Sequence, residues 1–360
     1  MSTARTWPVD VVVIGAGQAG LSSGYFLRRA GFAPGTGYVI LDGGAGPGGA
    51  WRERWPTLRL DRVHGIHDLP GLRMGPAAPS RPAAEAVAEY FAAYEEHFAL
   101  PVLRPVRVEA VRRAGERLLV ESDAGRWSAR AVINATGTWT NPFWPHYPGR
   151  ERFRGRQLHT ADYRGPEEFT GQHVVVVGGG SSAVQLLLEI AQVATTTWVT
   201  RRPPVFVPGP FTPELGRTVV ARVDEAVRAG RPPGSVVGAT GLVLTDEVRA
   251  ALDRGLLRRH PVFDRITPDG VAWDDGTEIR ADAILWCTGF RAALRHLAPL
   301  ELRGPGGGIR MDGAASTRVA AEPRVHLVGY GPSASTVGAT RAARAAVREI
   351  RELLADRVAA

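Results

Sequence analysis

The sequence predicts an α/β protein with two Rossmann-like βαβ domains, one inserted into the other. Three observations lead to this prediction. A strand, a glycine-rich turn and a helix follow one another near the N-terminus, and the same pattern returns after residue 172. Two other short strands end in small-residue turns, which suit a chain that leaves one domain and later returns to it. The length of 360 residues also fits two domains of about 150 residues each.

The first pattern begins with the apolar, β-branched run 9–14, as expected of a buried parallel strand. G-x-G-x-x-G follows from residue 15 to 20, and a helix is predicted over 21–30. A second strand over 38–41 ends in an acid about 20 residues after the last glycine. Free N–H groups at a helix N-terminus favour a pyrophosphate, and the acid suits a ribose hydroxyl. The residues predicted to bind this dinucleotide are Gly15, Gly17, Gln18, Ala19, Gly20 and Asp42.

The second pattern has a strand over 174–177, G-x-G-x-x-A from residue 178 to 183, a helix over 182–191 and a strand over 197–200. Two arginines stand where the first pattern has its acid, and a guanidinium suits a ribose 2′-phosphate. A solvated pair in an arginine-rich chain is the alternative. FAD in the first site and NADPH in the second is the simplest assignment. The predicted contacts at the second site are Gly178, Gly180, Ser181, Ser182, Ala183, Arg201 and Arg202.

The predicted domain boundaries come from two small-residue turns. A strand pair over 106–111 and 117–121, in which Val108 is a further predicted cofactor contact, precedes a strand over 131–133. That strand runs into a turn, as does a strand over 283–286, and both turns are predicted to border the cofactors. They are Ala135-Thr136-Gly137 and Cys287-Thr288-Gly289. We therefore predict an FAD-binding domain over 1–150 and 285–360, with an NADPH-binding domain over 151–284.

The C-terminal segment is predicted to close the first domain over the flavin nucleotide. A last strand over 325–328 runs into Gly329 and Gly331, predicted cofactor contacts. The helix that follows has an apolar side formed by Val337, Val347, Ile350 and Leu354. A helix over 81–100 also has an apolar side, which we expect to face the core rather than a membrane or a partner. Residues 203–260 hold several weak helices and are predicted to form part of a substrate lobe or a lid.

Composition excludes several function classes. The net charge is +8, but all 44 basic residues are scattered arginines, so we predict no nucleic-acid partner and no Schiff-base lysine. The single cysteine, Cys287, permits neither an internal disulfide nor a Cys-x-x-Cys pair, and this predicts a cytoplasmic protein. No apolar run approaches the roughly 20 residues of a membrane span, so no membrane partner is predicted. The oligomeric state is left open, with a homodimer as one option.

Residues 153–165, FRGRQLHTADYRG, show neither strand alternation nor helical spacing. They carry Phe153-x-Gly155-x3-His159-x3-Tyr163 between the two glycine patterns, and this spacing resembles the signature of the flavin-containing monooxygenases. Two more stretches resemble small bacterial members: the linker 136–149, and the flavin-side residues Gly48-Gly49, Trp51 and Arg52-x-Arg54-Trp55. The resemblance covers nearly the whole chain and implies a glutathione-reductase-like arrangement of the two domains.

The resemblance also implies a reaction. NADPH reduces FAD, the reduced flavin and O2 form a 4a-(hydro)peroxyflavin, and one oxygen atom passes to a soft small-molecule substrate: a sulfide, an amine or a small ketone. His159 is implied to hold the nicotinamide nucleotide and the geometry between the domains, rather than to act as a simple acid or base. The site residues that the resemblance implies are Gly49, Trp51 and Arg52 toward the flavin, and His159, Tyr163 and His64 near the reacting atoms.

This sequence departs from the family pattern at three places. Ser181-Ser182 stands where Asn-Ser is common, and Pro332 follows Gly331 where relatives often carry an acid. The active-site Asn of larger members has no obvious match, and His64 lies near its expected place. These departures concern the stability of the peroxyflavin rather than the cofactors.

Other classes share some of these motifs. A reductase that passes electrons to a disulfide needs two cysteines near the flavin, and this chain has one. An NAD(P)H oxidase that makes hydrogen peroxide would share every motif, so only kinetics separate it. An inactive nucleotide-binding sensor would be favoured by loss of a motif glycine or of His159, and neither is lost. The serines of the two patterns, Ser22, Ser23, Ser181 and Ser182, are predicted as phosphate contacts rather than nucleophiles.

Overall fold

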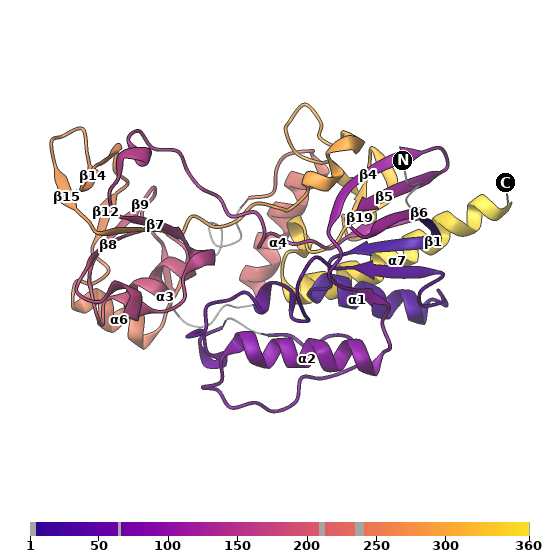
Figure 1. The fold of residues 1–360 in the computed structure, drawn as a ribbon, viewed down its shortest axis with the longest axis horizontal. Coiled ribbons are helices and arrows are strands. Elements are labelled where there is room, and N and C mark those ends of the chain that lie inside the picture. The colour runs from indigo at the N-terminus through magenta and orange to yellow at the C-terminus, as the bar shows by residue number, and fades with distance from the viewer. Residues whose placement is uncertain (1–4, 64–65, 209–212, 235–240, 360) are drawn as a thin grey trace.

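A computed structural model describes residues 5–63, 66–208, 213–234 and 241–359 of the chain. Figure 1 shows two lobes, a larger one that holds both ends of the chain and a smaller one, joined by crossing segments. Each lobe contains its own largely parallel sheet, so the predicted α/β class with two Rossmann-like units is confirmed. No helix in the described ranges combines the length and the apolar character that crossing a membrane requires.

The larger lobe contains a nine-stranded sheet whose central strands are parallel. The path runs β17-β18-β19-β6-β1-β2-β3, and β4 and β5 form an antiparallel hairpin that joins β6. The C-terminal halves of β1 and β6 are buried throughout, because their apolar residues run without alternation. The bounds are β1 (Thr6–Ile14), β2 (Tyr38–Leu41), β3 (Val102–Leu103), β4 (Val108–Ala114), β5 (Arg117–Ser122), β6 (Gly125–Asn134), β17 (Met311–Asp312), β18 (Arg318–Val319) and β19 (Glu322–Leu327).

Three helices share one core with this sheet: α1 (Gln18–Arg29), α2 (Ala83–His97) and α7 (Thr336–Ala359). α1 and α7 lie side by side, and α2 packs beneath α1 in the view of Figure 1. The predicted core face of α2 is confirmed, since Val87, Tyr90, Phe91 and Tyr94 are buried. On α7 the prediction holds for the buried residues Val347, Ile350 and Leu354. It is wrong for Val337, which lies in the first turn and is 42% exposed.

The smaller lobe is built on a five-stranded sheet of order β12-β9-β8-β16-β7, parallel throughout. Two smaller sheets accompany it, the parallel pair β10–β11 and the antiparallel β13–β14–β15. The strand bounds are β7 (Arg156–His159), β8 (His173–Val177), β9 (Thr195–Thr200), β10 (Phe206–Pro208), β11 (Leu242–Leu244), β12 (Arg259–Pro261), β13 (Arg265–Thr267), β14 (Gly270–Ala272), β15 (Glu278–Arg280) and β16 (Ala283–Trp286). Its helices are α3 (Ser181–Ile190) and α6 (Asp246–Asp253).

The segment 153–165 is not free of regular structure, so that part of the sequence prediction is wrong. Its residues 156–159 form β7, the edge strand that pairs with β16. Leu158 and His159 are both buried, although they are neighbours in the strand. Four residues are too few to show a period, and the pairing partner lies more than 120 residues away. The strand therefore leaves no local pattern in the sequence.

α4 (Pro213–Arg228) lies inside the predicted domain 151–284 but packs on the larger lobe. Figure 1 shows it beside the larger lobe, near the gap between the lobes. Val223 and Val227 are buried, and Val227 belongs to the core on one face of the nine-stranded sheet. A Cβ on Gly331 would lie 3.1 Å from a Val227 methyl carbon. The weak helices predicted in 203–260 thus include one that closes against the C-terminal glycine turn.

The loop 51–63 of the larger lobe packs into the smaller one. Trp55 and Leu58 share the core of the smaller sheet with Tyr163. Thr57 donates a hydrogen bond to Glu189 of α3 at 3.0 Å, and Gln185 of α3 donates to the Arg62 carbonyl at 2.9 Å. These contacts join the two lobes away from the crossing segments.

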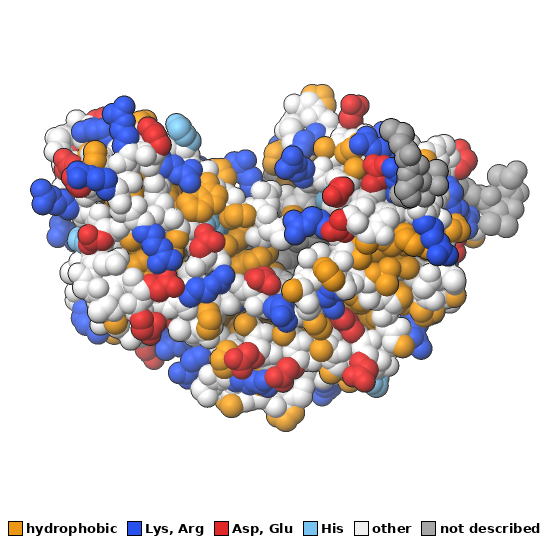
Figure 2. All heavy atoms as spheres, in the orientation of Figure 1, with side chains coloured by type: hydrophobic (Ala, Val, Ile, Leu, Met, Phe, Trp, Pro, Cys, Tyr) orange, Lys and Arg blue, Asp and Glu red, His pale blue; other side chains and the backbone are white. Residues whose placement is uncertain are grey.

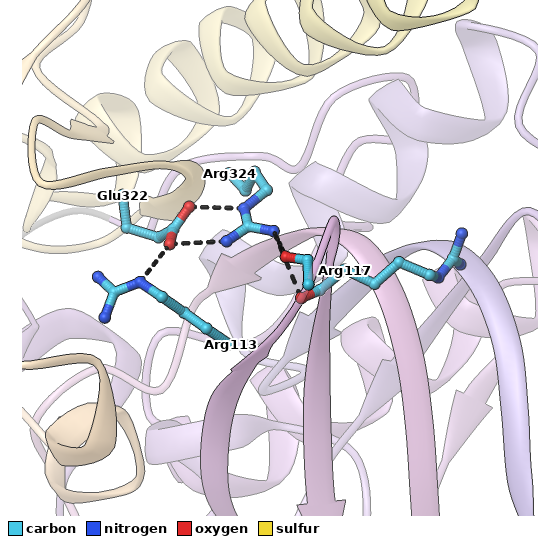
Figure 3. A network of polar contacts seen from close by, with 5 residues as sticks. Arg113, Arg117, Glu322 and Arg324 are labelled. Carbon is cyan, nitrogen blue, oxygen red and sulfur yellow. Dashed lines mark hydrogen bonds and ion pairs between the residues drawn. The ribbon is translucent and has the colours of Figure 1, made fainter.

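A buried ion pair fastens the β4–β5 hairpin to β19 (Figure 3). Arg324 donates to both carboxylate oxygens of Glu322, at 2.6 and 2.9 Å, and both side chains are less than 10% exposed. Arg324 also donates to the carbonyl oxygens of Gly115 and Arg117, at 3.1 and 3.3 Å. Arg113 of β4 donates to Glu322 at 2.9 Å. Because the ends of β4 and β5 carry these groups, the hairpin is held in one place on the sheet.

Candidate active site

Each of the two glycine patterns lies in one lobe, and segments of the chain cross between the lobes (Figure 1). Figure 2 shows the outline hollowed between the lobes at the top of the view, with acidic and basic side chains mixed over this face. The C-terminal ends of β1 and β6 meet the N-terminus of α1, as the C-terminal ends of β8 and β16 meet that of α3. Ligands of open α/β sheets bind beyond such strand ends.

Glycine stands at the positions of the first pattern for different physical reasons. Gly15 has φ +99°, and a Cβ on Gly20 would lie 1.8 Å from the Gly15 carbonyl oxygen, so protein packing alone requires both glycines. A Cβ on Gly17 would meet nothing closer than Gly49 Cα, at 3.9 Å. Gly17 therefore leaves open the space in front of the helix N-terminus. Gly49 has φ +52° and approaches Gly17 so closely that its own Cβ would lie 2.8 Å from Gly17 Cα.

The N-terminus of α1 fits a phosphate group. It has no acidic residue in its first turn and no side-chain cap, so its N–H groups are free of protein side-chain partners. Gln18 Oε1 is buried without a hydrogen-bond partner, and Gln18 Nε2 donates to the His67 carbonyl at 3.5 Å. Ala19 is buried, and a Cβ on Gly329 would lie 3.3 Å from its methyl group. The C-terminal glycine turn thus adjoins the first pattern.

Ser22 and Ser23 do not take part in this N-terminus, contrary to the sequence prediction. Both lie within α1 and are fully buried. Ser22 Oγ shares a hydrogen bond with Thr340 of α7, and Ser23 Oγ donates to the Ala19 carbonyl at 2.8 Å. One helical turn separates them from the free N–H groups, so they serve the packing of α1 instead.

Asp42 stands at the C-terminal end of β2, beside the first glycine turn. Its Oδ1 accepts from the Ala16 N–H at 3.3 Å, and its Oδ2 accepts from Arg104 at 2.7 Å. Arg104 also binds both oxygens of Glu95, at 2.9 and 3.0 Å. Arg104 and Glu95 could not be found from the sequence, since no fixed spacing relates them to Asp42. The acid is therefore oriented by a guanidinium as well as by the glycine turn.

Val106 and Arg107 lie next to Asp42 and Gly43, and the predicted contact Val108 follows them in the chain. The Val106 N–H donates to the Asp42 carbonyl at 2.8 Å. A Cβ on Gly43 would lie 3.8 Å from Arg107 Cα. Val108 is the first residue of β4 and pairs with Ser122. The strand predicted over 106–111 begins at Val108 instead, because the boundary of a strand that follows a proline-containing turn is hard to fix from sequence.

The second glycine pattern is joined to the returning hinge segment. Gly178 has φ +145°, and a Cβ there would lie 2.2 Å from the Cys287 carbonyl oxygen. Gly180 is the N-cap of α3, and no side chain caps this helix. Ser181 and Ser182 lie in its first turn, and Ala183 is buried. The N-terminus of α3 thus also offers free N–H groups to an anion.

Arg201 and Arg202 follow β9 and are exposed. A third arginine, Arg259 of β12, lies beside them: its Nε donates to Thr200 Oγ1 at 2.7 Å and its Nη2 to the Thr200 carbonyl at 3.2 Å. Arg259 could not be found from the sequence, because β12 has only three residues and its register with β9 is set by pairing alone. The end of β9 is therefore followed by Arg201 and Arg202, and Arg259 is hydrogen-bonded to its last residue, Thr200.

The two hinge turns are held together by polar contacts. Thr136 Oγ1 donates to the Ala293 carbonyl at 2.8 Å, and the Ala293 N–H donates to the Gly137 carbonyl at 3.0 Å. The Gly289 carbonyl accepts from the Phe143 N–H at 2.9 Å, and the Thr288 hydroxyl donates to the Phe143 carbonyl. Gly137 and Gly289 both have positive φ, 59° and 79°, with no protein atom within 4 Å of an added Cβ.

A buried histidine supports the first hinge turn. His296 Nε2 lies 2.6 Å from Asn134 Oδ1, and the neutral ring donates this hydrogen bond. Burial lowers the pKa of His296 to about 4. Asn134 in turn donates to Thr136 Oγ1 at 3.1 Å. Neither His296 nor Asn134 was singled out from the sequence as a supporting residue.

His159 lies at the end of β7 with both ring nitrogens bound to the backbone. Its Nε2 is 3.0 Å from the Gly289 carbonyl, and its Nδ1 accepts from the Ala161 N–H at 3.2 Å. Burial lowers the pKa of His159, so the neutral ring with its proton on Nε2 fits both contacts. The side chain is fully buried and touches the rings of Trp144 and Phe290. These contacts suit a residue that positions the hinge.

Tyr163 is fully buried in the core of the smaller lobe. Its hydroxyl donates to Glu189 at 2.7 Å, and its ring stacks on Phe169 and meets Trp55 edge-on. Burial raises the pKa of Tyr163, so the hydroxyl stays protonated. The described residues therefore enclose this side chain completely, and its contact with Trp55 links it to the loop 51–63. His64 lies outside the described residues.

Cys287 has its side chain inside the protein. It is buried, and burial raises the pKa of its thiol to about 12. A thiol of this kind stays protonated at neutral pH and is a poor nucleophile. The small-residue packing role predicted for it fits this environment.

Comparisons with known proteins show which family model matches the chain and which solved structures resemble it. The model of the pyridine nucleotide-disulphide oxidoreductase family matches residues 12–231. A flavin-containing monooxygenase from Stenotrophomonas maltophilia is 44% identical, covers 97% of this chain and 99% of its own, and superposes with a TM-score of 0.81. A Baeyer–Villiger monooxygenase from Streptomyces coelicolor is 28% identical over 78% of this chain and 64% of its own. A bacillithiol disulfide reductase from Staphylococcus aureus, 15% identical over 97% of this chain and 99% of its own, shares the fold with a TM-score of 0.68.

Proposed function

The chain belongs to the pyridine nucleotide-disulphide oxidoreductase family as a flavin-dependent monooxygenase that uses FAD and NADPH, and we propose that it oxygenates soft nucleophiles. Sulfides and amines are the proposed substrates, with small ketones as a further class. One oxygen atom of O2 enters the substrate, and NADPH supplies the two electrons that reduce the other atom to water. The observation that supports this proposal is a pair of uncapped helix N-termini, on α1 and α3, on either side of one hinge.

The first of these N-termini fits FAD. Gly17 and Gly49 leave room for a pyrophosphate against the backbone, and Asp42 is oriented toward the glycine turn by Arg104. The turns at Gly137 and Gly329, both with positive φ, complete the proposed cradle. The bound flavin would supply the redox chemistry, accepting hydride from the nicotinamide and activating O2.

The second N-terminus fits NADPH, with Ser181 and Ser182 in its first turn. Arg201 and Arg202 are proposed to bind the 2′-phosphate, and Arg259 is proposed to hold the turn that carries them. An arginine fork binds phosphate oxygens in pairs, whereas a ribose hydroxyl gives it no charge to bind. The enzyme is therefore proposed to prefer NADPH to NADH.

His159 is proposed to position rather than to transfer protons. Its Nε2–H holds the Gly289 carbonyl, which also accepts from the Phe143 N–H. The rings of Trp144 and Phe290 pack against the imidazole and exclude water from it. A rigid, dry hinge keeps the two nucleotides in a fixed relation, and this is the main contribution a protein makes to chemistry carried by cofactors.

A disulfide reductase or an NAD(P)H oxidase is the alternative. The reductase is disfavoured because the only cysteine is buried and its thiol pKa is raised to about 12. The oxidase shares the whole site, so turnover must distinguish it. We also propose that the enzyme works in the cytoplasm.

The proposal is tested by turnover in ¹⁸O2 with NADPH and a panel of alkyl aryl sulfides, tertiary amines and small ketones. The expected result is one ¹⁸O atom in the product and one product molecule per NADPH oxidised. Hydrogen peroxide equal to the NADPH consumed, with no labelled product from any member of the panel, would favour the oxidase instead.

A further inference from the structure

Arg54 is a cation held between two tryptophans. Its guanidinium carbon lies 5.8 Å from the ring centre of Trp51 and 4.5 Å from that of Trp139. Its Nε is buried without a hydrogen-bond partner. Burial lowers the pKa of Arg54 to about 10, and no described carboxylate lies close enough to counter this effect. The side chain therefore remains charged at neutral pH.

Arg54 is partly buried, and a charge that is removed from water without a partner costs up to several kcal/mol per ion. This chain pairs other arginines that are little exposed: Arg104 binds Asp42 and Glu95, and Arg324 binds Glu322. The two tryptophan faces compensate for only part of the cost, because a cation–π contact is worth about 0.5–2 kcal/mol. The contrast indicates that the counter-charge of Arg54 comes from a bound molecule.

The position of Arg54 narrows the choice of that molecule. Trp139 stacks on Phe290, with ring centres 4.7 Å apart, and Phe290 meets the His159 ring edge-on at 4.9 Å. Trp51 packs against the cores of both lobes. Arg54 thus lies at the hinge, whereas the phosphates of the two nucleotides have their own donors at α1, at α3 and around Thr200.

We propose that Arg54 binds the carboxylate of an aromatic acid that is the substrate of this enzyme. The inference rests on the proposed function and names its substrate class: a planar ring that carries both an oxidisable group and a carboxylate. A guanidinium fork matches the two oxygens of a carboxylate. The rings of Trp139 and Phe290 beside it favour an aromatic body. A phosphate of NADPH or FAD is the other possible source of anionic oxygens, and the test separates the two.

The test measures binding to the oxidised, FAD-loaded enzyme without NADPH or O2. Phenylacetate and 3-phenylpropionate are compared with their uncharged amides, through the change that each causes in the flavin absorbance. Wild type is expected to bind an acid at least about tenfold more tightly than its amide, in line with one charge-assisted hydrogen-bond pair. Arg54→Gln should bind acid and amide equally. Arg54→Lys should keep part of the preference, because it keeps the charge but not the fork.

Arg291→Gln is the matched control. Its guanidinium also stacks on a ring, 4.1 Å from the centre of Phe143, but the residue is exposed. This variant should keep the full preference for the acid.

Three outcomes would overturn the proposal: an acid preference that survives in Arg54→Gln, no saturable binding of either acid to wild type, or a loss of FAD content or NADP⁺ affinity in Arg54→Gln. The last outcome would assign the guanidinium to a cofactor phosphate. Because no turnover is involved, these results are independent of whether the enzyme inserts oxygen.

Discussion

Gly17 and Gly20 belong to one motif but face different constraints at the scale of the single residue. Gly20→Ala would place a methyl carbon 1.8 Å from the Gly15 carbonyl oxygen, so the turn must shift and we expect a loss of folded protein. Gly17→Ala meets no protein atom within 3.8 Å, and its φ of −83° suits alanine. We expect Gly17→Ala to fold, with an unfolding midpoint close to wild type, but to be purified with little FAD. A Gly17→Ala protein with full flavin content would contradict the assignment of this helix N-terminus.

The arginines around Thr200 give a second prediction at this scale. Replacing Arg201 and Arg202 with glutamine should raise the Kd of NADPH at least about tenfold, since a charge-assisted hydrogen bond is worth about 1.5–3 kcal/mol. The Kd of NADH should change little. Titration with 2′-phospho-AMP and with AMP gives the same comparison without turnover, and Arg258→Gln, an exposed neighbour of Arg259, serves as the control. Equal losses for both nucleotides would sink the assignment.

At the scale of the element, the ion pair between Glu322 and Arg324 fixes the β4–β5 hairpin to β19 (Figure 3). Glu322→Gln leaves the charged Arg324 guanidinium without its counter-charge in a site that is less than 10% exposed. We expect a loss of about 3–5 kcal/mol in the free energy of unfolding, measured by urea titration. Arg112→Gln breaks a comparable but exposed pair with Glu121, and should cost less than about 1 kcal/mol. Similar losses in the two variants would show that burial does not govern this contact.

Helices and strands whose apolar residues follow a regular pattern could be predicted from the sequence. Strands that form only by pairing with residues far away in the chain could not. α2 shows its core face in the spacing of Val87, Tyr90 and Phe91, and β1 shows its burial in an unbroken apolar run. β7 and β12 have four and three residues, and only pairing with β16 and β9 makes them strands. The docking of α4 on the larger lobe depends on Val227 meeting the Gly331 turn, which no local pattern indicates.

The same distinction applies within the site. The glycine patterns, Asp42 and His159 were found because their spacing along the chain is regular. Their supporting partners, Arg104, Glu189 and Arg259, come from segments with no fixed spacing to them. Tyr163 matched the motif, but its burial against Trp55 could not be foreseen from the sequence.

Buried neutral histidines make the free energy of unfolding of the whole molecule depend on pH. Burial lowers the pKa of His296 to about 4 and that of His326 to about 3, whereas an unfolded histidine has a pKa of about 6.5. The folded-state pKa values are depressed, so the stability associated with the neutral rings is complete above about pH 6.5 and is lost as the pH falls toward 4 and then 3. Each histidine should contribute about 2 kcal/mol of this loss between pH 6.5 and 5.

Urea unfolding of the holoenzyme at pH 7.5, 6.5 and 5.0 measures this dependence. His296→Gln should lose about 2 kcal/mol less than wild type over the acidic step, because its side chain does not titrate. His97→Gln removes an exposed histidine and should follow the wild-type curve. Parallel curves for wild type and His296→Gln would contradict the burial of a neutral ring beside Asn134.

The central claim for the whole molecule is that two nucleotides act across one hinge to direct O2 to a substrate. The most direct test is a two-step mixing experiment on the FAD-loaded protein. The flavin is reduced anaerobically with NADPH, and in a parallel experiment with NADH, then mixed with O2 while its absorbance and the peroxide formed are recorded. We predict that the oxidised spectrum returns slowly after NADPH, faster after NADH, and that a sulfide speeds the return without releasing peroxide. Immediate return of the oxidised spectrum with one peroxide per flavin, whichever nucleotide is used, would contradict a monooxygenase.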